Sequence, residues 1–196
     1  MTTVAPPHSR AQNLKLATAD VHNNIDKSIM VKDPFANTQN YIQFLTLQYY
    51  FLNDVSALYD HSELNMVIEN LSARQRLNML EQDFHDFEHP IPNTPFISQI
   101  SNDTDLATAL GWLYVVEGSK VGAAMLGKQA QARLQLTKEY GARYLSGPGA
   151  GRGSDWRHLV QLIDSIELND TQERALINGA RQAFTRFQLF QAHVYS

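Results

Sequence analysis

The sequence predicts a single all-α domain of about six to eight helices. Apolar residues recur at spacings of three and four along most of the chain, and this spacing places them on one face of an α-helix. Runs in which apolar and polar residues alternate, as in a half-buried strand, are missing. The chain has 196 residues, which is a usual length for one domain, and breaks rich in proline or glycine separate its periodic segments.

The first helix is expected to follow a short leader at residues 1–9, so that the folded domain covers residues 10–196. Pro6 and Pro7 lie in this leader, and Pro34 ends the first periodic segment. The apolar face of this helix carries Leu14, Thr18, Val21, His22 and Ile25.

Further helices are expected between the remaining breaks. A second face carries Tyr41, Phe44, Leu45, Tyr49, Leu52, Val55 and Tyr59. After the proline-rich segment 89–95, a third face carries Leu106, Leu110, Leu113, Tyr114, Val121, Met125 and Leu134. Two more faces follow the glycine-rich loop 146–153, with Leu159, Leu162, Ile163 and Ile166, and then Leu176, Ala180, Phe184, Phe187 and Phe190. The residues suited to N-caps are Asp33, Asn37, Asn102 or Asp103, Ser154, and Asn169 or Asp170.

The composition excludes several classes of protein. The chain has no cysteine, which rules out disulfides, thiolate metal sites, iron–sulfur clusters and cysteine nucleophiles. A net charge of −4 argues against a nucleic-acid partner, because binding to a phosphate backbone requires a basic face. We find no apolar run long enough to cross a bilayer, no signal peptide and no lipidation motif. We therefore expect a cytoplasmic protein with no membrane partner.

One helical segment, residues 112–128, carries glycines at positions 118, 122 and 127. Each glycine inside a helix costs about 0.5–1 kcal/mol relative to alanine, so three of them require a reason. Either another helix packs closely against this segment, or a large flat ligand approaches its backbone. A phosphate-binding loop is disfavoured, because Gln129 replaces the required hydroxyl after Lys128 and no strand precedes the motif.

Two arrangements of histidines could bind a metal. His85 and His89 lie one helical turn apart, but Pro90 ends the helix there, and a solvated helix end explains them better. His22 lies on the apolar face of the first helix, where it is either a satisfied core residue or a ligand. Lys15 lies about 10 Å earlier on the same face. It is either a solvated lysine or a cation that reaches carboxylates at the edge of a planar macrocycle bound by His22.

Other patterns typical of catalysis are weak. The sequence has neither a Gly-x-Ser-x-Gly elbow nor a pairing of carboxylate and histidine that indicates hydrolysis. One group of charges is expected to form a solvated helix face: Glu69, Arg74, Arg76 and Glu81.

Several stretches of the chain resemble the bacterial haem oxygenases, in particular those with which Gram-negative pathogens acquire iron. The most specific stretch is residues 109–123, which contains Gly-Trp-Leu-Tyr-Val-Val-Glu-Gly-Ser. The similarity extends from about Asn13 to Phe190 and includes residues 14–22, 33–35 and 48–54.

The resemblance implies a helical bundle in which haem lies between a proximal helix and a kinked distal helix that contains glycines. His22 matches the proximal ligand of the haem iron, and Gly118 and Gly122 match glycines whose backbone lies against the porphyrin. The catalytic residues implied are Gly118, Ser119, Gly122 and Asn53. The cofactor-binding residues implied are His22, Lys15, Tyr114, Val115 and Phe184. Phe184 and Phe187 either wall the pocket or belong to the plain core.

The resemblance also implies the reaction and its partners. Haem is both substrate and cofactor, and O₂ with electrons converts it to biliverdin, CO and free Fe²⁺, which releases iron for use by the cell. The sequence contains no reductase motif, so the electrons are expected to come from a separate reductase or ferredoxin. We expect a monomer.

The position at which the ring opens is expected to follow from the seating of the haem. Lys15 and Tyr114 match residues that contact the propionates and favour attack at the α-meso carbon, and Gln129 stands where members that cleave elsewhere add a basic residue. Asn53 stands where some relatives have a histidine in the distal water network, so it is expected to anchor water without donating a proton as an imidazolium. Arg74 or Arg76 could complete that network.

Two alternatives belong to other classes of protein. A haem carrier or sensor on the same scaffold would need a second strong axial ligand opposite His22, and none is evident. An all-α interaction module without a cofactor would show no haem spectrum and no sensitivity to substitution at His22.

Overall fold

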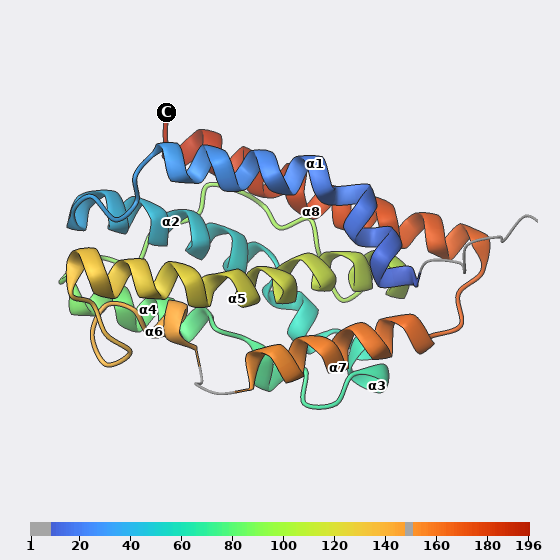
Figure 1. Ribbon diagram of the computed structural model, residues 1–196. Helices are drawn as coiled ribbons and strands as arrows, with labels where there is room; N and C mark the ends of the chain where they lie inside the picture. Colours follow the sequence, from blue (N-terminus) through green and yellow to red (C-terminus); the bar gives the residue numbers. More distant parts are fainter. Residues whose placement is uncertain (1–8, 148–150) are drawn as a thin grey trace, which may run out of the picture.

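The computed structural model describes residues 9–147 and 151–196, and Figure 1 shows the arrangement of its helices. These are α1 (Arg10–Val31), α2 (Thr38–Asp54), α3 (Ser62–Val67), α4 (Leu77–Asp86), α5 (Leu106–Leu134), α6 (Arg143–Ser146), α7 (Arg152–Ser165) and α8 (Asp170–Val194). Two 3₁₀ helices, η1 (Ser56–Asp60) and η2 (Ser72–Arg74), lie between α2 and α4. The described residues contain isolated bridges near Thr137 and no strand, so the predicted all-α class is confirmed.

Polar side chains cap the beginnings of the four longest helices. Ser9 and Asn169 each form a capping box, in which the cap and a glutamine three residues later bond to each other's backbone N–H groups. Asn37 and Asp105 accept a hydrogen bond from the backbone N–H three residues on. Ser9 ends the expected leader, whose remaining residues 1–8 lie outside the described part of the chain.

Three of the expected caps were wrong. The cap of α5 expected at residues 102–103 lies at Asp105, because the chain makes a turn before the helix begins. Ser154 lies inside α7, which begins directly after Gly151. Asp33 adopts a left-handed conformation with φ of 44° in the turn before α2, and Asn37 is the cap.

The long helix α5 packs most extensively against α8, and two glycines permit this contact. A Cβ atom at Gly111 would lie 2.1 Å from the carbonyl oxygen of Leu176, and one at Gly179 would lie 2.4 Å from that of Thr108. The two backbones therefore touch where neither helix has a side chain. This close approach was not predicted from the sequence.

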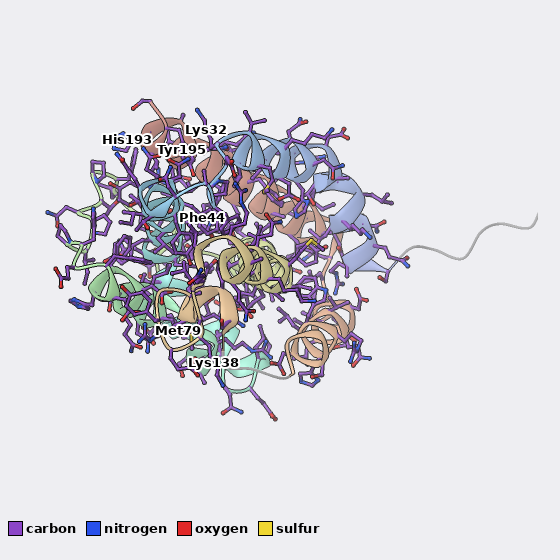
Figure 2. The ribbon with its side chains drawn as sticks, turned by 60° about the vertical axis from the view of Figure 1, so that its left-hand side comes forward. Lys32, Phe44, Met79, Lys138, His193 and Tyr195 are labelled. Atoms are coloured by element: carbon purple, nitrogen blue, oxygen red, sulfur yellow. The ribbon has the colours of Figure 1, made fainter. Side chains whose placement is uncertain are left out.

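Helix α1 packs on α8, and the two run side by side in Figure 1 with α5 beneath them and α7 lower still. The ends of α1 and α8 meet where Nζ of Lys32 lies 5.3 Å from the centre of the Tyr195 ring, and Figure 2 labels both residues. At the other end of α1, the Arg10 guanidinium pairs with Glu173 of α8. No helix of the described residues is both long enough and apolar enough to cross a membrane.

A buried carboxylate joins α4 to α6. Asp83 is fully buried and accepts hydrogen bonds from the backbone N–H groups of Arg143, at 2.8 Å, and Tyr144, at 3.0 Å. Burial raises the pKa of Asp83 to about 6, although the two backbone bonds and the Arg143 guanidinium oppose this rise. Because Asp83 ionises near pH 6 and its charge is buried, the stability of this contact between α4 and α6 depends on pH.

Candidate functional site

The side chain of His22 projects from α1 with 55% of its surface exposed, which contradicts its interpretation as a satisfied core residue. Its Nδ1 atom lies 3.4 Å from Oδ2 of Asp26, one helical turn later. Its ring meets the Phe184 ring of α8 edge-on, at 5.8 Å between centroids. A carboxylate beside Nδ1 favours the proton there and leaves Nε2 with a free lone pair, which is the form of imidazole that binds a metal.

Lys15 lies on the same helix and is also exposed. Lys15 and His22 lie seven residues apart, which is two turns, so this face of α1 offers a metal-binding group and a cation to a ligand.

The glycines of α5 differ in their surroundings. A Cβ atom at Gly122 would meet no described atom within 4 Å, whereas one at Gly118 would lie 3.2 Å from the tip of the Trp156 ring. Close packing of another helix therefore does not explain Gly122, and approach of a ligand remains as the explanation. The neighbours Val121 and Met125 are 42% and 70% exposed, so apolar area borders this open position.

Helix α5 continues unbroken through its glycines, and the kink expected there stays a prediction. Ser119 is exposed, and its hydroxyl donates to the Val116 carbonyl at 2.7 Å. A Cβ atom at Gly127 would make ordinary contact with Leu145, at 3.5 Å. Gly127 is therefore a packing position, unlike Gly122.

Tyr114 and Trp156 form a second aromatic contact, between α5 and α7. Their ring centroids lie 5.2 Å apart, and Trp156 also covers Gly118. Burial raises the pKa of Tyr114, so its phenol stays protonated at neutral pH and can donate a hydrogen bond. Val115, the next residue, is buried in the core. Sequence reasoning missed Trp156, although a large aromatic residue within the polar stretch at the start of α7 could have indicated it.

The remaining expected residues lie elsewhere in the bundle. Asn53 is half-buried in the last turn of α2, and no described contact joins it to the glycines of α5. Phe184 and Phe187 are both buried in α8. Phe184 also contacts the His22 ring, whereas Phe187 packs edge-on against Phe51, at 5.2 Å between centroids.

A buried polar cluster lies on the side of α5 that faces η1 and η2. Nζ of Lys120 donates to Glu117 Oε1 at 2.5 Å, to the Tyr59 hydroxyl at 3.0 Å and to the Arg74 carbonyl at 2.5 Å. Burial lowers the pKa of Lys120 to about 8; Glu117 opposes this effect, and Arg76 and Arg74 add to it. Arg74 is half-buried and Arg76 is buried, so the prediction that they belong to a solvated helix face was wrong.

The groups around α1 and α5 fit a haem. An exposed imidazole with a carboxylate beside it is a group of the kind that would hold a haem iron from one side. The open position at Gly122 lets a flat ring reach the backbone of α5.

Comparison with known proteins identifies the family. The family model described as Heme oxygenase matches residues 8–192. The chain is 40% identical over 191 residues to Heme oxygenase PigA of Pseudomonas aeruginosa, and the match covers 95% of this chain and 96% of that protein.

Solved structures agree with this match. The NO- and CO-bound heme oxygenase from Neisseria meningitidis superposes with a TM-score of 0.88 at 34% identity, over 96% of this chain and 93% of that one. Heme oxygenase from Leptospira interrogans, at 20% identity and a TM-score of 0.73, covers 93% of this chain and 98% of that one and shows the shared fold. The chain therefore belongs to the heme oxygenase family, as its resemblance implied, and is a haem-degrading oxygenase.

Proposed function

We propose that this protein holds haem between α1 and α5 and opens the ring with O₂ and electrons to give biliverdin, CO and Fe²⁺, so that iron is released. The observation that carries the proposal is the open position at Gly122, in a helix where glycine is costly and no described side chain fills the space. The exposed His22, with Asp26 beside its Nδ1, supports the same placement. Both features are on the helices that the family resemblance assigns to the two faces of haem.

The roles of the residues follow from their chemistry. The Nε2 atom of His22 binds the iron, and Asp26, whose Oδ2 lies 3.4 Å from Nδ1, favours the proton on Nδ1 and so leaves Nε2 as the ligand atom. The open position at Gly122 brings the backbone of α5 close to the opposite face, and Gly118, one turn earlier beside Trp156, extends this stretch of backbone. The exposed Ser119 between them donates to the Val116 carbonyl and keeps its oxygen as an acceptor for ordered water. Bound haem supplies the iron at which O₂ is activated once reduced. The protein's own part is to bind, to orient and to restrict the direction of attack.

In this proposal, the meso carbon at which the haem ring opens is determined by the residues that bind the two propionates. Lys15 on α1 supplies a cation and Tyr114 on α5 supplies a protonated phenol, and both can bind a propionate. Together they seat the ring so that the α-meso carbon faces the activated oxygen. Val115 and Phe184 contribute apolar area, and Asn53 anchors water at the end of α2.

The reaction needs partners that this chain does not supply. Its electrons come from a separate reductase or ferredoxin, and O₂ enters from solution. We expect the monomer to be sufficient for the chemistry, because all the proposed residues belong to one chain.

The proposal is tested by mixing the protein with equimolar haem and adding ascorbate in air, with catalase present to remove free peroxide. We expect the haem Soret band to give way to the absorption of a verdin, and chromatography of the product to identify α-biliverdin. A haem complex whose spectrum persists under these conditions would instead establish a carrier. Biliverdin of another isomer would leave the reaction standing and overturn the assignment of Lys15 and Tyr114.

A further inference from the structure

The turn that follows α1 is tied to the end of α5 by an ion pair between residues that lie 100 positions apart in the chain. Nη1 of Arg133 donates to Oδ1 of Asp33 at 2.6 Å, and Nη2 donates to Oδ2 at 3.1 Å. We propose that this pair fixes the position of α1 along α5 and thereby aligns the groups that face the two sides of haem. The inference rests on the proposed function, because it names residues that position the haem site from outside it.

The two helices run in the same direction and are tied at the same end. In Figure 1 both run from right to left; Asp33 follows the end of α1, and Arg133 lies in the last turn of α5. His22 lies eleven residues before Asp33, and Gly122 lies eleven residues before Arg133. With a rise of about 1.5 Å per residue, each of them is about 15 Å from the ion pair.

The same match extends to the groups proposed to bind the propionates. Lys15 lies eighteen residues before Asp33, and Tyr114 lies nineteen residues before Arg133. The two positions therefore agree to within one residue, a rise of about 1.5 Å. A slip of α1 along α5 by one turn, about 5 Å, would remove both matches at once. The ion pair is thus placed where it can hold the alignment that the site requires.

Both partners of the ion pair are held by their own surroundings. On the α1 side, the side-chain amide of Asn40 donates to the carbonyl oxygens of Lys32, at 3.2 Å, and Asp33, at 3.1 Å. On the α5 side, the helix is closed by the backbone N–H of Gln135, which donates back into its last turn. The pair therefore joins two fixed chain segments, so its geometry is transmitted to the helices.

The packing of the two helices leaves this role to the ion pair. Helix α1 packs mainly against α8 and α7, and α5 packs most extensively against α8. The proposed site needs haem between α1 and α5, so direct packing of one on the other cannot align them there. A guanidinium that bonds to both carboxylate oxygens fixes direction as well as distance. Since an exposed ion pair adds little to stability, we expect its loss to change alignment more than unfolding.

The alignment can be measured in the haem-free protein with two spin labels. The chain has no cysteine, so Asn24→Cys on α1 and Ala124→Cys on α5, both at exposed positions, carry the labels alone. Double electron–electron resonance on this labelled parent gives the distribution of distances between them. We expect the distribution to shift, or to become about twice as wide, when Arg133→Gln or Asp33→Asn removes the paired charges. Asparagine suits residue 33, whose φ of 44° is left-handed.

Further variants separate the two-oxygen contact from charge and from general damage. Arg133→Lys keeps the charge but cannot bond to both oxygens in the same way, so it should resemble Arg133→Gln. The double variant Asp33→Asn with Arg133→Gln should be no worse than either single change, because both remove one interaction. Lys138→Gln, which removes an exposed lysine beside Glu139 shortly after α5, should behave as the parent. Circular dichroism establishes that each variant is folded.

Haem reports whether the alignment matters for the site. In Arg133→Gln and Asp33→Asn without labels, haem should dissociate at least threefold faster than from the wild type. The ascorbate reaction should give a mixture of biliverdin isomers. The Soret spectrum, which reports the ligand His22, should stay that of the wild type.

Two results would overturn the proposal. Unchanged label distances in both single variants would show that the ion pair does not align the helices. Changed distances with an unchanged rate of haem dissociation would show that this alignment does not seat haem. A wild type that binds haem but does not open it would contradict the proposed function alone, because label distances and haem dissociation still test the ion pair.

Discussion

At the scale of single residues, His22 with Asp26 beside it is the expected ligand of the haem iron. Replacing His22 by alanine should remove the axial ligand, change the Soret spectrum and weaken haem binding at least about tenfold, which corresponds to about 1.4 kcal/mol. Absorption titration with haem measures both effects, and added imidazole should restore the spectrum of the wild type. His85→Ala, an exposed histidine on α4, is the control. An unchanged spectrum in His22→Ala would place the ligand elsewhere.

Comparison of Gly122 with Gly127 distinguishes a glycine that faces a ligand from one that packs against another helix. Gly122→Ala should raise the free energy of unfolding by about 0.5–1 kcal/mol, since alanine favours a helix and its Cβ has room in the haem-free protein. The same change should slow haem turnover, because the methyl group would stand where the ring approaches. Denaturant unfolding and the ascorbate assay measure the two effects.

Gly127→Ala serves as the matched control for that prediction. Gly127 lies on the same helix as Gly122, and its Cβ would make only ordinary contacts with Leu145 of α6, so stability should rise while turnover stays that of the wild type. Equal turnover in Gly122→Ala and the wild type would mean that haem does not lie against Gly122.

Some residues of the candidate site could be predicted from the sequence, and others could not. His22 and the glycines of α5 were singled out because each breaks a local rule, a polar ring on an apolar face or glycine inside a helix, and only the family resemblance then gave them a role at haem. Arg74 and Arg76 were assigned to the surface, because nothing local reveals that η2 folds against α5 and buries them. Trp156 was missed because its partners, Tyr114 and Gly118, are distant in the sequence.

At the scale of helices, the contact between α5 and α8 depends on two small residues. Gly111→Ala should lower the free energy of unfolding by about 1–3 kcal/mol, because its Cβ would lie 2.1 Å from a backbone oxygen that cannot move without separating the helices. This loss should exceed the gain in helix propensity. Urea unfolding measures it, and a variant as stable as Gly127→Ala would contradict the close approach of the backbones.

The sequence predicted where helices lie better than where they begin. Asn37 and Asn169 were found as caps because each directly precedes a periodic segment. Asp105 and Gly151 were missed because the turns before α5 and α7 contain several polar or glycine residues that could end them. Tertiary contacts, which the sequence pattern does not contain, decide among such candidates.

At the scale of the whole molecule, Asp83 links stability to pH. Its pKa is raised from 3.8 to about 6 in the fold, so the folded state binds its proton more tightly than the unfolded chain does. The contribution of this group to stability is therefore complete below about pH 4 and is lost as pH rises through about 6. At neutral pH the loss is on the order of 3 kcal/mol.

The variant Asp83→Asn tests this linkage, since it cannot ionise but keeps an oxygen for a backbone N–H. Thermal or urea unfolding at several pH values should show that the variant loses less stability than the wild type between about pH 4 and pH 7. Its stability at any one pH also reflects the lost interaction with Arg143, so the slope is the relevant quantity. Parallel slopes for the two proteins would mean that Asp83 ionises as freely as in the unfolded chain.

The overall architecture followed from the sequence because helix periodicity is local. The positions of the long helices agree with the apolar faces, but their mutual packing through Gly111 and Gly179 involves residues far apart in the chain. The meaning of the open position at Gly122 likewise needed the fold, since only the packed structure distinguishes it from Gly127.

The central claim is that haem lies between α1 and α5, with His22 on one face and the glycine backbone on the other. A crystal structure of the protein with ferric haem tests it most directly. We expect the iron to be bonded to Nε2 of His22, Asp26 to contact Nδ1, and the porphyrin to lie against the backbone at Gly118 and Gly122. An iron bound by another residue, or a ring that leaves Gly122 open to solvent, would contradict the account.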